Sequence, residues 1–225
     1  MLQSLLNLFF PKVCYACYQP LMAQEDAICI HCRNALPITN FHFDHNPAIK
    51  KVLYGRADIE QGTALFRFEK KGLVQQLIHE LKYKGHQYIG EVLGDWLGGE
   101  LKNLPEWQTI DVVIPVPMHK KKLRKRGYNQ VTKFGQRIAL ALDAAYREDL
   151  LLKVVHTKSQ VKKTRSERAQ NINDLYALER PQELSGKHIL IVDDLITTGA
   201  TLEGCINILK QAENVKISIA TMAIA

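Results

Sequence analysis

His188–Leu202 reads HILIVDDLITTGATL, and this stretch decides the fold class. It contains an apolar quartet, Ile189 to Val192, in which three of the four residues are β-branched. A short apolar run between a glycine and a pair of acids is typical of a strand that is buried on both faces, as in a parallel sheet. The stretch therefore predicts an α/β fold, with a parallel sheet flanked by helices.

Polar residues follow the predicted strand directly. Asp193 and Asp194 lie at its carboxyl end, where open α/β sheets place their ligands. The small residues of segment 197–201 come next, followed by apolar residues at helical spacing. We therefore expect a turn that opens a helix, where free backbone N–H groups, hydroxyl groups and the helix dipole can bind one anion.

The alternative is an ordinary strand, turn and capped helix, because Thr and Gly are good capping residues. The combination favours a binding site instead. Two carboxylates can hold a sugar diol, or a metal shared with it, while the loop takes a phosphate, and this chemistry matches 5-phosphoribosyl-1-pyrophosphate (PRPP). The predicted PRPP ligands are Asp193, Asp194, Thr197, Thr198, Gly199, Ala200 and Thr201.

Composition and charge narrow the class of protein. At 225 residues the chain is long enough for one core and a small appendage, and its net charge of +7 suits a polyphosphate or a nucleic acid. The apolar opening, residues 1–10, lacks a basic start and meets a proline at Pro11. It is too short for a signal peptide or a membrane span, so we expect a cytoplasmic protein without stable membrane insertion.

Four cysteines near the N-terminus form two Cys-x-x-Cys pairs, namely Cys14 with Cys17 and Cys29 with Cys32. Two such pairs predict a closed structural zinc site; the alternatives are disulfides or unrelated buried thiols. A reducing compartment disfavours disulfides. We therefore predict an N-terminal segment with a zinc finger over residues 1–45 and a second domain over residues 46–225.

Two histidines, His42 and His45, lie in the junction between these domains and are expected to be solvent-exposed linker residues. Cys205 stands alone and is expected in the core. Further apolar patterns predict strands at 64–68, 111–117, 150–155 and 215–224, and helices at 73–81, 89–97 and 131–142. The basic segment 82–85 between two of these helices is either a helix end or a binding element.

A strongly basic run, residues 118–126, follows the predicted strand at 111–117. Charge runs are usually solvated faces. In a parallel sheet, however, this loop comes beside the phosphate loop, and Arg124 and Arg126 can bind a pyrophosphate with two donors each. A second basic segment, residues 156–168, is expected to be either disordered or a mobile functional loop whose cations can close over a polyanion.

Together these blocks resemble the ComF family, the ComFC/GntX-like competence proteins, over nearly the whole chain. The matching motifs are the four cysteines behind LFFPKVC, then LIHELKYKG, DVVIPVPMHKKKLRKRGYNQ, TKSQVKKTRSERAQNI and ILIVDDLITTGATL. The resemblance implies a type I phosphoribosyltransferase fold, Mg²⁺ bound together with PRPP, and Arg168 and Asn171 at the mobile loop. It also implies a role in natural transformation, with single-stranded DNA and a helicase-like competence protein as partners.

Three functions follow from these features: a PRPP-capable module that grips single-stranded DNA, an active phosphoribosyltransferase, or a protein-interaction scaffold. The first is the favoured interpretation. Thr197 stands where purine salvage transferases have a third acid, which argues against a purine substrate. The sequence predicts the PRPP site strongly but offers little sign of a base that activates a nucleophile, so the question of catalysis stays open.

Overall fold

A five-stranded sheet forms the centre of the protein in the computed structural model, which describes residues 11–154 and 175–225. The strand order is β1-β7-β6-β2-β3, and every pair is parallel. The predicted parallel α/β architecture is thereby confirmed. The strands are β1 (Gly62–Arg67), β2 (Val112–Pro115), β3 (Ala145–Tyr146), β6 (His188–Ile196) and β7 (Lys216–Ile224).

β6 lies inside this sheet, with β2 on one side and β7 on the other. Ile189 to Val192 are fully buried, as the apolar quartet predicts. Alternate residues contribute to two separate cores, because successive side chains of a strand point to opposite faces. The strand continues in register with β7 as far as Ile196, four residues beyond the quartet.

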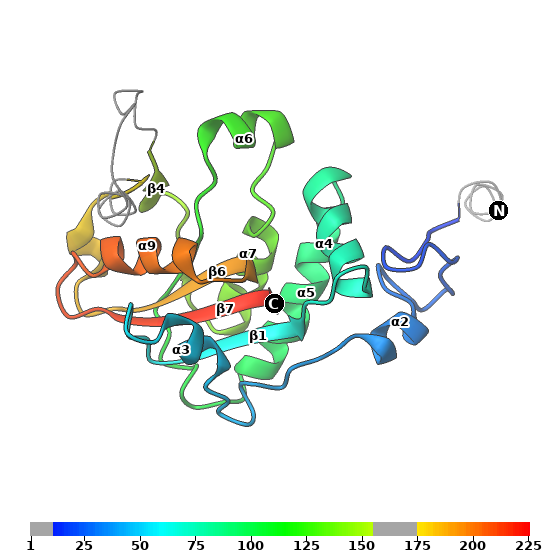
Figure 1. The fold of residues 1–225 in the computed structure, drawn as a ribbon, viewed down its shortest axis with the longest axis horizontal. Coiled ribbons are helices and arrows are strands. Elements are labelled where there is room, and N and C mark those ends of the chain that lie inside the picture. The colour runs from blue at the N-terminus through cyan, green and yellow to red at the C-terminus, as the bar shows by residue number, and fades with distance from the viewer. Residues whose placement is uncertain (1–10, 155–174) are drawn as a thin grey trace.

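Helices cover both faces of the sheet, as Figure 1 shows. One core is built on α4, α5 and α7, and the other on α3 and α9. The predicted helices at 73–81, 89–97 and 131–142 are present with slightly different ends. The helices are α2 (Ile30–Ala35), α3 (Ala48–Leu53), α4 (Leu73–Tyr83), α5 (Tyr88–Leu101), α6 (Lys120–Arg126), α7 (Thr132–Ala141) and α9 (Ala200–Leu209), with a 3₁₀ turn, η2, at Pro181–Leu184.

Two smaller elements stand apart from the main sheet. The predicted strand at 150–155 is present as β4 (Leu151–Lys153), which pairs antiparallel with β5 (Tyr176–Leu178). These two strands flank segment 155–174, which lies outside the described residues. α6 projects away from the sheet beside β4 in Figure 1 and buries none of its residues.

The N-terminal segment packs against the remainder of the protein through polar contacts. The Tyr18 hydroxyl donates to Glu80 Oε1 of α4 at 2.7 Å, and the Tyr15 and His86 rings lie 4.4 Å apart. The chain then runs beside β1, where the Thr39 amide donates to the Leu65 carbonyl at 3.0 Å. The finger is therefore fixed to the sheet layer along α4 and β1.

The prediction that His42 is an exposed linker residue is wrong. His42 is buried, with Nδ1 3.0 Å from the Thr63 hydroxyl and Nε2 3.0 Å from Glu100 Oε2. His45 is exposed, as expected. The difference arises because the junction places the His42 ring against the sheet, where the Thr63 hydroxyl bonds to Nδ1 and the Glu100 carboxylate lies beside Nε2.

Among the helices of the described ranges, 11–154 and 175–225, none combines the length and the apolar character that a membrane crossing requires.

Close packing between α5 and α7 gives a test of this fold. A Cβ at Gly94 would lie 2.7 Å from the Phe134 carbonyl oxygen and 2.8 Å from Arg137 Cβ, whereas a Cβ at Gly99 meets open space. Gly94→Ala is therefore expected to lower the free energy of unfolding by about 1–3 kcal/mol, the usual cost of overpacking. Chemical denaturation measures the change.

Gly99→Ala is the matched control in the same helix. It is expected to be neutral or to stabilise the protein by up to about 1 kcal/mol, because alanine is the better helix former. Equal effects of the two substitutions would contradict the described helix packing.

Candidate functional site

The loop after β6 turns sharply into α9 at Gly199. Gly199 has a left-handed backbone, with φ of 77°, and α9 begins at the next residue. Thr197 and Thr198 are exposed. Within the described residues, the amides of Ala200, Thr201 and Leu202 donate to no protein acceptor, because the first helical bond is that from the Glu203 amide to the Gly199 carbonyl, at 2.9 Å.

These amides line a small pocket together with Asp193 and the side chains of the turn. Unpaired amides and the positive end of a helix dipole stabilise an anion at such a place. The structure therefore brings the predicted loop residues 197–201 together around one concave site that suits a phosphate.

The end of α3 holds this loop in place. A Cβ at Gly199 would lie 2.9 Å from Leu53 Cδ2, so only glycine allows the observed approach. Arg56 Nη2 donates to the Thr198 carbonyl at 2.6 Å, and Arg56 Nη1 pairs with Glu203 Oε2 at 3.1 Å. Sequence reasoning missed Arg56, which lies 142 residues from Thr198 and has no motif of its own.

Asp194 is buried and is engaged at both carboxylate oxygens. Lys82 Nζ donates to Oδ1 at 2.7 Å, and Gln130 Nε2 donates to Oδ2 at 2.5 Å. Lys82 is in the last turn of α4, and Gln130 is in the loop that precedes α7. A carboxylate taken out of water needs such partners, and both oxygens of Asp194 have one.

Asp193 is only partly buried and faces the other side of the sheet. Successive strand residues alternate, and Asp193 turns toward α9, where it adds to burial in raising the pKa of Cys205. Burial, followed by the charge of Asp194, raises the pKa of Asp193 itself. The two acids therefore differ: both oxygens of Asp194 accept hydrogen bonds from protein side chains, whereas Asp193 lies beside the loop and has a raised pKa.

The basic run is a short helix, α6, rather than an extended loop. His119 Nδ1 accepts from the Lys121 amide at 3.1 Å, and the left-handed Gly127 ends the helix. Arg126 donates to Gln130 Oε1 and lies over the Tyr83 ring, 5.5 Å from its centroid. Gln130 thus links Arg126 to Asp194.

Arg124 is exposed on the same helix. Two further predicted site residues, Arg168 and Asn171, lie outside the described residues. Arg126 and Gln130 connect the loop after β2 to Asp194, which lies within β6. That this loop also comes beside residues 197–201 stays a prediction.

Lys82 and Gln130 were not predicted as site residues. Segment 82–85 carries a lysine-rich pattern that fits a helix end equally well, and Lys82 is 112 residues from Asp194. A contact of this kind depends on the tertiary fold, so periodicity and motif spacing do not reveal it. The one available signal is a lysine at the end of an amphipathic helix, three residues before a glycine.

The expected Mg²⁺ can be tested against these side chains. Magnesium needs near-ideal octahedral geometry and binds through one or two carboxylates. Both oxygens of Asp194 already accept hydrogen bonds, and Asp193 faces away from it. In this arrangement the acid pair does not offer two free carboxylates to one ion, so Mg²⁺ does not fit at Asp194.

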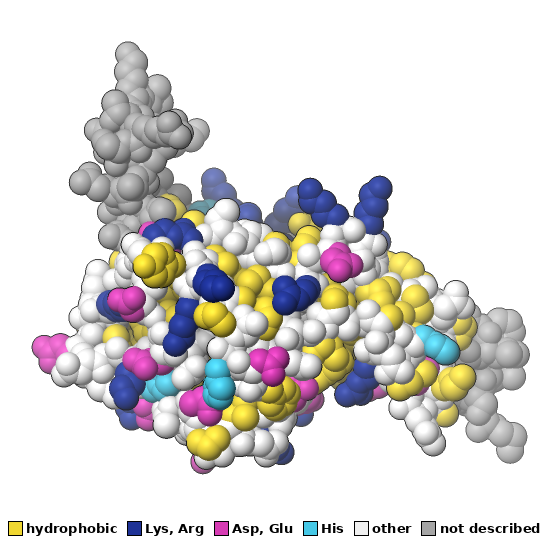
Figure 2. Space-filling view, turned by 60° about the horizontal axis from the view of Figure 1, so that its bottom comes forward, with side chains coloured by type: hydrophobic (Ala, Val, Ile, Leu, Met, Phe, Trp, Pro, Cys, Tyr) yellow, Lys and Arg dark blue, Asp and Glu magenta, His cyan; other side chains and the backbone are white. Residues whose placement is uncertain are grey.

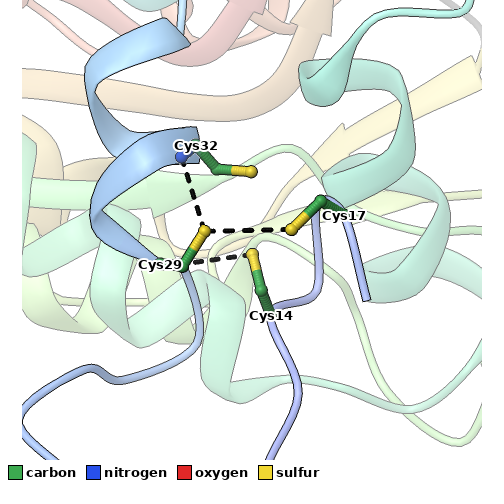
Figure 3. A group of neighbouring side chains, drawn as sticks. All are labelled: Cys14, Cys17, Cys29 and Cys32. Atoms are coloured by element: carbon green, nitrogen blue, oxygen red, sulfur yellow. Dashed lines mark hydrogen bonds between the residues drawn. The ribbon is translucent and has the colours of Figure 1, made fainter. Parts of the chain in front are cut away.

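The four cysteines form a compact cluster, in which all four sulfurs point toward one another (Figure 3). None is in a disulfide. The Sγ atoms all lie within 4.8 Å of one another, and those of Cys17 and Cys29 are 3.8 Å apart. A tetrahedral zinc with Zn–S bonds of about 2.3 Å requires sulfur separations of about 3.8 Å.

Backbone amides support the cluster. The Cys29 amide donates to Cys14 Sγ at 3.3 Å, and the Cys32 amide donates to Cys29 Sγ at 3.5 Å. Burial raises the pKa of Cys14, but amide donors outweigh that effect and lower the pKa to about 7. The donor set and its geometry therefore fit a structural Zn²⁺ held by Cys14, Cys17, Cys29 and Cys32.

Replacing Cys14 and Cys17 by Ser is expected to release about one zinc per chain and to lower the melting temperature, because zinc ligation contributes folding free energy. Elemental analysis and thermal unfolding measure the two effects. Cys205→Ser, at a buried cysteine far from the cluster in the sequence, should retain the metal. Zinc content that is unchanged after the double replacement would contradict the assignment of these ligands.

Comparisons with known proteins agree with this geometry. The family model described as "Phosphoribosyl transferase domain" matches residues 132–224. A DNA utilization protein YhgH of Escherichia coli O157:H7 is 26% identical over 212 residues, which cover 85% of this chain and 88% of that protein. Competence protein F of Haemophilus influenzae is 27% identical over 139 residues, which cover 60% of this chain and 61% of that protein.

A third relative, competence protein ComFC of Bacillus subtilis, is 23% identical over 192 residues, which cover 85% of this chain and 75% of that protein. This chain combines an N-terminal cysteine cluster with a parallel sheet and a loop between β6 and α9. The similarity to the competence and DNA utilization proteins, together with the phosphoribosyltransferase domain match, supports a ComF-family protein with a type I phosphoribosyltransferase fold.

Proposed function

We propose that this protein acts in the handling of DNA during natural transformation, by binding incoming single-stranded DNA next to a PRPP site, and that it works in the cytoplasm. The names of the relatives, which refer to competence and to DNA utilization, support the general role. The observation that carries the proposal is the link that Gln130 makes between the strongly basic helix α6 and Asp194, three residues before the loop at 197–201.

The loop at 197–201 supplies the PRPP part of the proposal. Its free amides, exposed threonine hydroxyls and helix dipole favour a dianionic phosphate. Asp193 lies beside the same pocket and can accept hydrogen bonds from ribose hydroxyls. The 5-phosphate of PRPP is therefore placed at the loop, with the sugar directed toward the acids.

α6 supplies the nucleic-acid part. Six of its seven residues are cations and none is buried, so α6 presents a concentrated positive charge that a polyanion can neutralise. Cations project along the upper edge of Figure 2, whereas the face turned toward the viewer intersperses them with acids. A charge concentrated in this way releases counterions when it meets phosphates and raises the affinity for DNA.

An aromatic side chain lies next to this charge. Tyr83 is 68% exposed, with the Arg126 guanidinium over its ring and the His79 ring 5.0 Å away. Exposed aromatic rings beside cations are typical of surfaces that stack the bases of single-stranded nucleic acids. We therefore place the DNA strand over α6 and the end of α4, with one base on Tyr83.

A helicase-like competence protein is a further partner that we propose from the family alone. The alternative function is an active phosphoribosyltransferase, favoured by the intact loop at 197–201. Release of pyrophosphate from PRPP in the presence of candidate acceptors, measured in a coupled assay, separates the two. Sustained release that Asp193→Asn abolishes would favour the enzyme.

Ala200→Asp tests the phosphate site. A carboxylate at the first position of α9 complements the helix dipole, so stability should be unchanged or raised by about 0.3–1 kcal/mol. The same charge repels a phosphate, so binding of ribose 5-phosphate should weaken at least about tenfold, or 1.4 kcal/mol. Calorimetry measures both the stability and the affinity for ribose 5-phosphate. Unchanged ribose 5-phosphate affinity in the stable variant would contradict the site.

Lys121, Lys122 and Lys125 test the DNA surface. Replacing all three by Gln should weaken binding of a single-stranded oligonucleotide and reduce the slope of log affinity against log salt by up to about 2, since each phosphate contact contributes about 0.7. Fluorescence anisotropy at several salt concentrations measures the slope.

The matched control replaces three exposed lysines that lie elsewhere, Lys102, Lys210 and Lys216, and removes the same net charge. It should leave the slope nearly unchanged. If both triple variants lose affinity equally, binding follows net charge alone, and α6 is not the DNA surface.

A further inference from the structure

The contact between Lys82 and Asp194 joins the end of α4 to β6. Lys82 lies in the last turn of α4, and its ammonium group reaches β6, where it is 2.7 Å from Asp194 Oδ1. The end of α4 is held by the Tyr128 hydroxyl, which donates to the Leu81 carbonyl, and Leu81 itself is buried. The lysine is therefore presented to the acid by an anchored helix.

The Asp194 side chain has little contact with water. Its relative exposure is 7%, against 21% for the Lys82 side chain. Gln130 Nε2 occupies the second oxygen, and Arg126 holds Gln130 in the orientation that donates. Removing one partner of such a buried pair leaves a charge without compensation, which is strongly unfavourable.

A divalent ion at Asp194 would have to replace this arrangement. It would approach an ammonium group already bound to the same carboxylate, and like charges repel. It would also have to break the Gln130 bond in order to reach Oδ2. The position that a metal takes beside a carboxylate is thus filled by a side chain of the protein.

We propose that Lys82 is the resident cation of the acid pair, and that the site takes a phosphoribosyl ligand without a divalent metal at Asp194. The inference rests on the proposed function, because it describes how the same site binds its ligand. The ammonium group donates to the carboxylate and faces the sugar end of the ligand, while the amides at Ala200–Leu202 hold the phosphate.

Ribose 5-phosphate is the probe that tests the inference, because it lacks the pyrophosphate that carries Mg²⁺ in solution. Calorimetric titration of the wild-type protein should give Kd values that differ by less than about threefold between EDTA and excess Mg²⁺. Binding that requires Mg²⁺ would overturn the inference and leave the proposed function in place. A lack of binding in both conditions would overturn the proposed function.

Lys82→Met removes the charge and keeps most of the apolar stem. In EDTA it should weaken ribose 5-phosphate binding at least about tenfold, and Mg²⁺ should restore much of the loss. Lys82→Arg should bind like the wild type. Lys84→Met removes an exposed lysine two residues along the same segment and should stay independent of metal.

A second readout needs no phosphoribosyl ligand. Mn²⁺ binding, followed by electron paramagnetic resonance, should be absent from the wild-type acid pair and should appear in Lys82→Met. The gained site should disappear when Asp194→Asn is added. Wild-type Mn²⁺ binding that Asp194→Asn removes would overturn the inference. This comparison of the wild type with Asp194→Asn can be made even if Lys82→Met is too unstable to purify.

Discussion

The burial of Ile189 to Val192 between two parallel neighbours is the constraint on which the site depends. A strand that is apolar on both faces must lie inside the sheet, and a parallel sheet directs the carboxyl ends of β2 and β6 to the same edge. That edge receives Asp193, Asp194, the phosphate loop and the start of the basic helix. Each quartet side chain contributes about 1.5–3 kcal/mol on burial, so the strand position is strongly determined.

Charge is then distributed unevenly around this edge. Asp194 is neutralised within the protein by Lys82, whereas the amides at the start of α9 have no protein acceptor among the described residues. α6 adds six cations that bury nothing. This edge therefore favours the binding of anions, although it contains two acids. A phosphorylated sugar and a nucleic-acid backbone are both anions of a suitable kind.

Sequence patterns predict those parts whose signal is local. The β6 quartet, the turn at Gly199 and the two cysteine pairs each lie within a few residues, and the structure places them as expected. The cysteine cluster in particular follows from spacing, because two Cys-x-x-Cys pairs can together supply four thiolates to one tetrahedral ion.

Contacts between distant segments escape this kind of reasoning. Lys82 meets Asp194 across 112 residues, and Arg56 meets Thr198 across 142. His42 was expected to be exposed to solvent for the same reason, because no nearby residue in the sequence indicates Thr63 or Glu100 as its neighbours. The basic run was expected to be a loop, and repulsion among six like charges opposes helix formation. It forms the short helix α6 instead, which His119 and Gly127 cap at its two ends.

Backbone amide chemical shifts test the central claim most directly, namely that a phosphate binds to free N–H groups at the start of α9. In a ¹⁵N–¹H spectrum titrated with ribose 5-phosphate, we expect the largest changes at the amides of Gly199, Ala200, Thr201 and Leu202, with saturation at a single Kd. Shifts confined to α6, or unchanged loop amides at saturating ligand, would contradict the account.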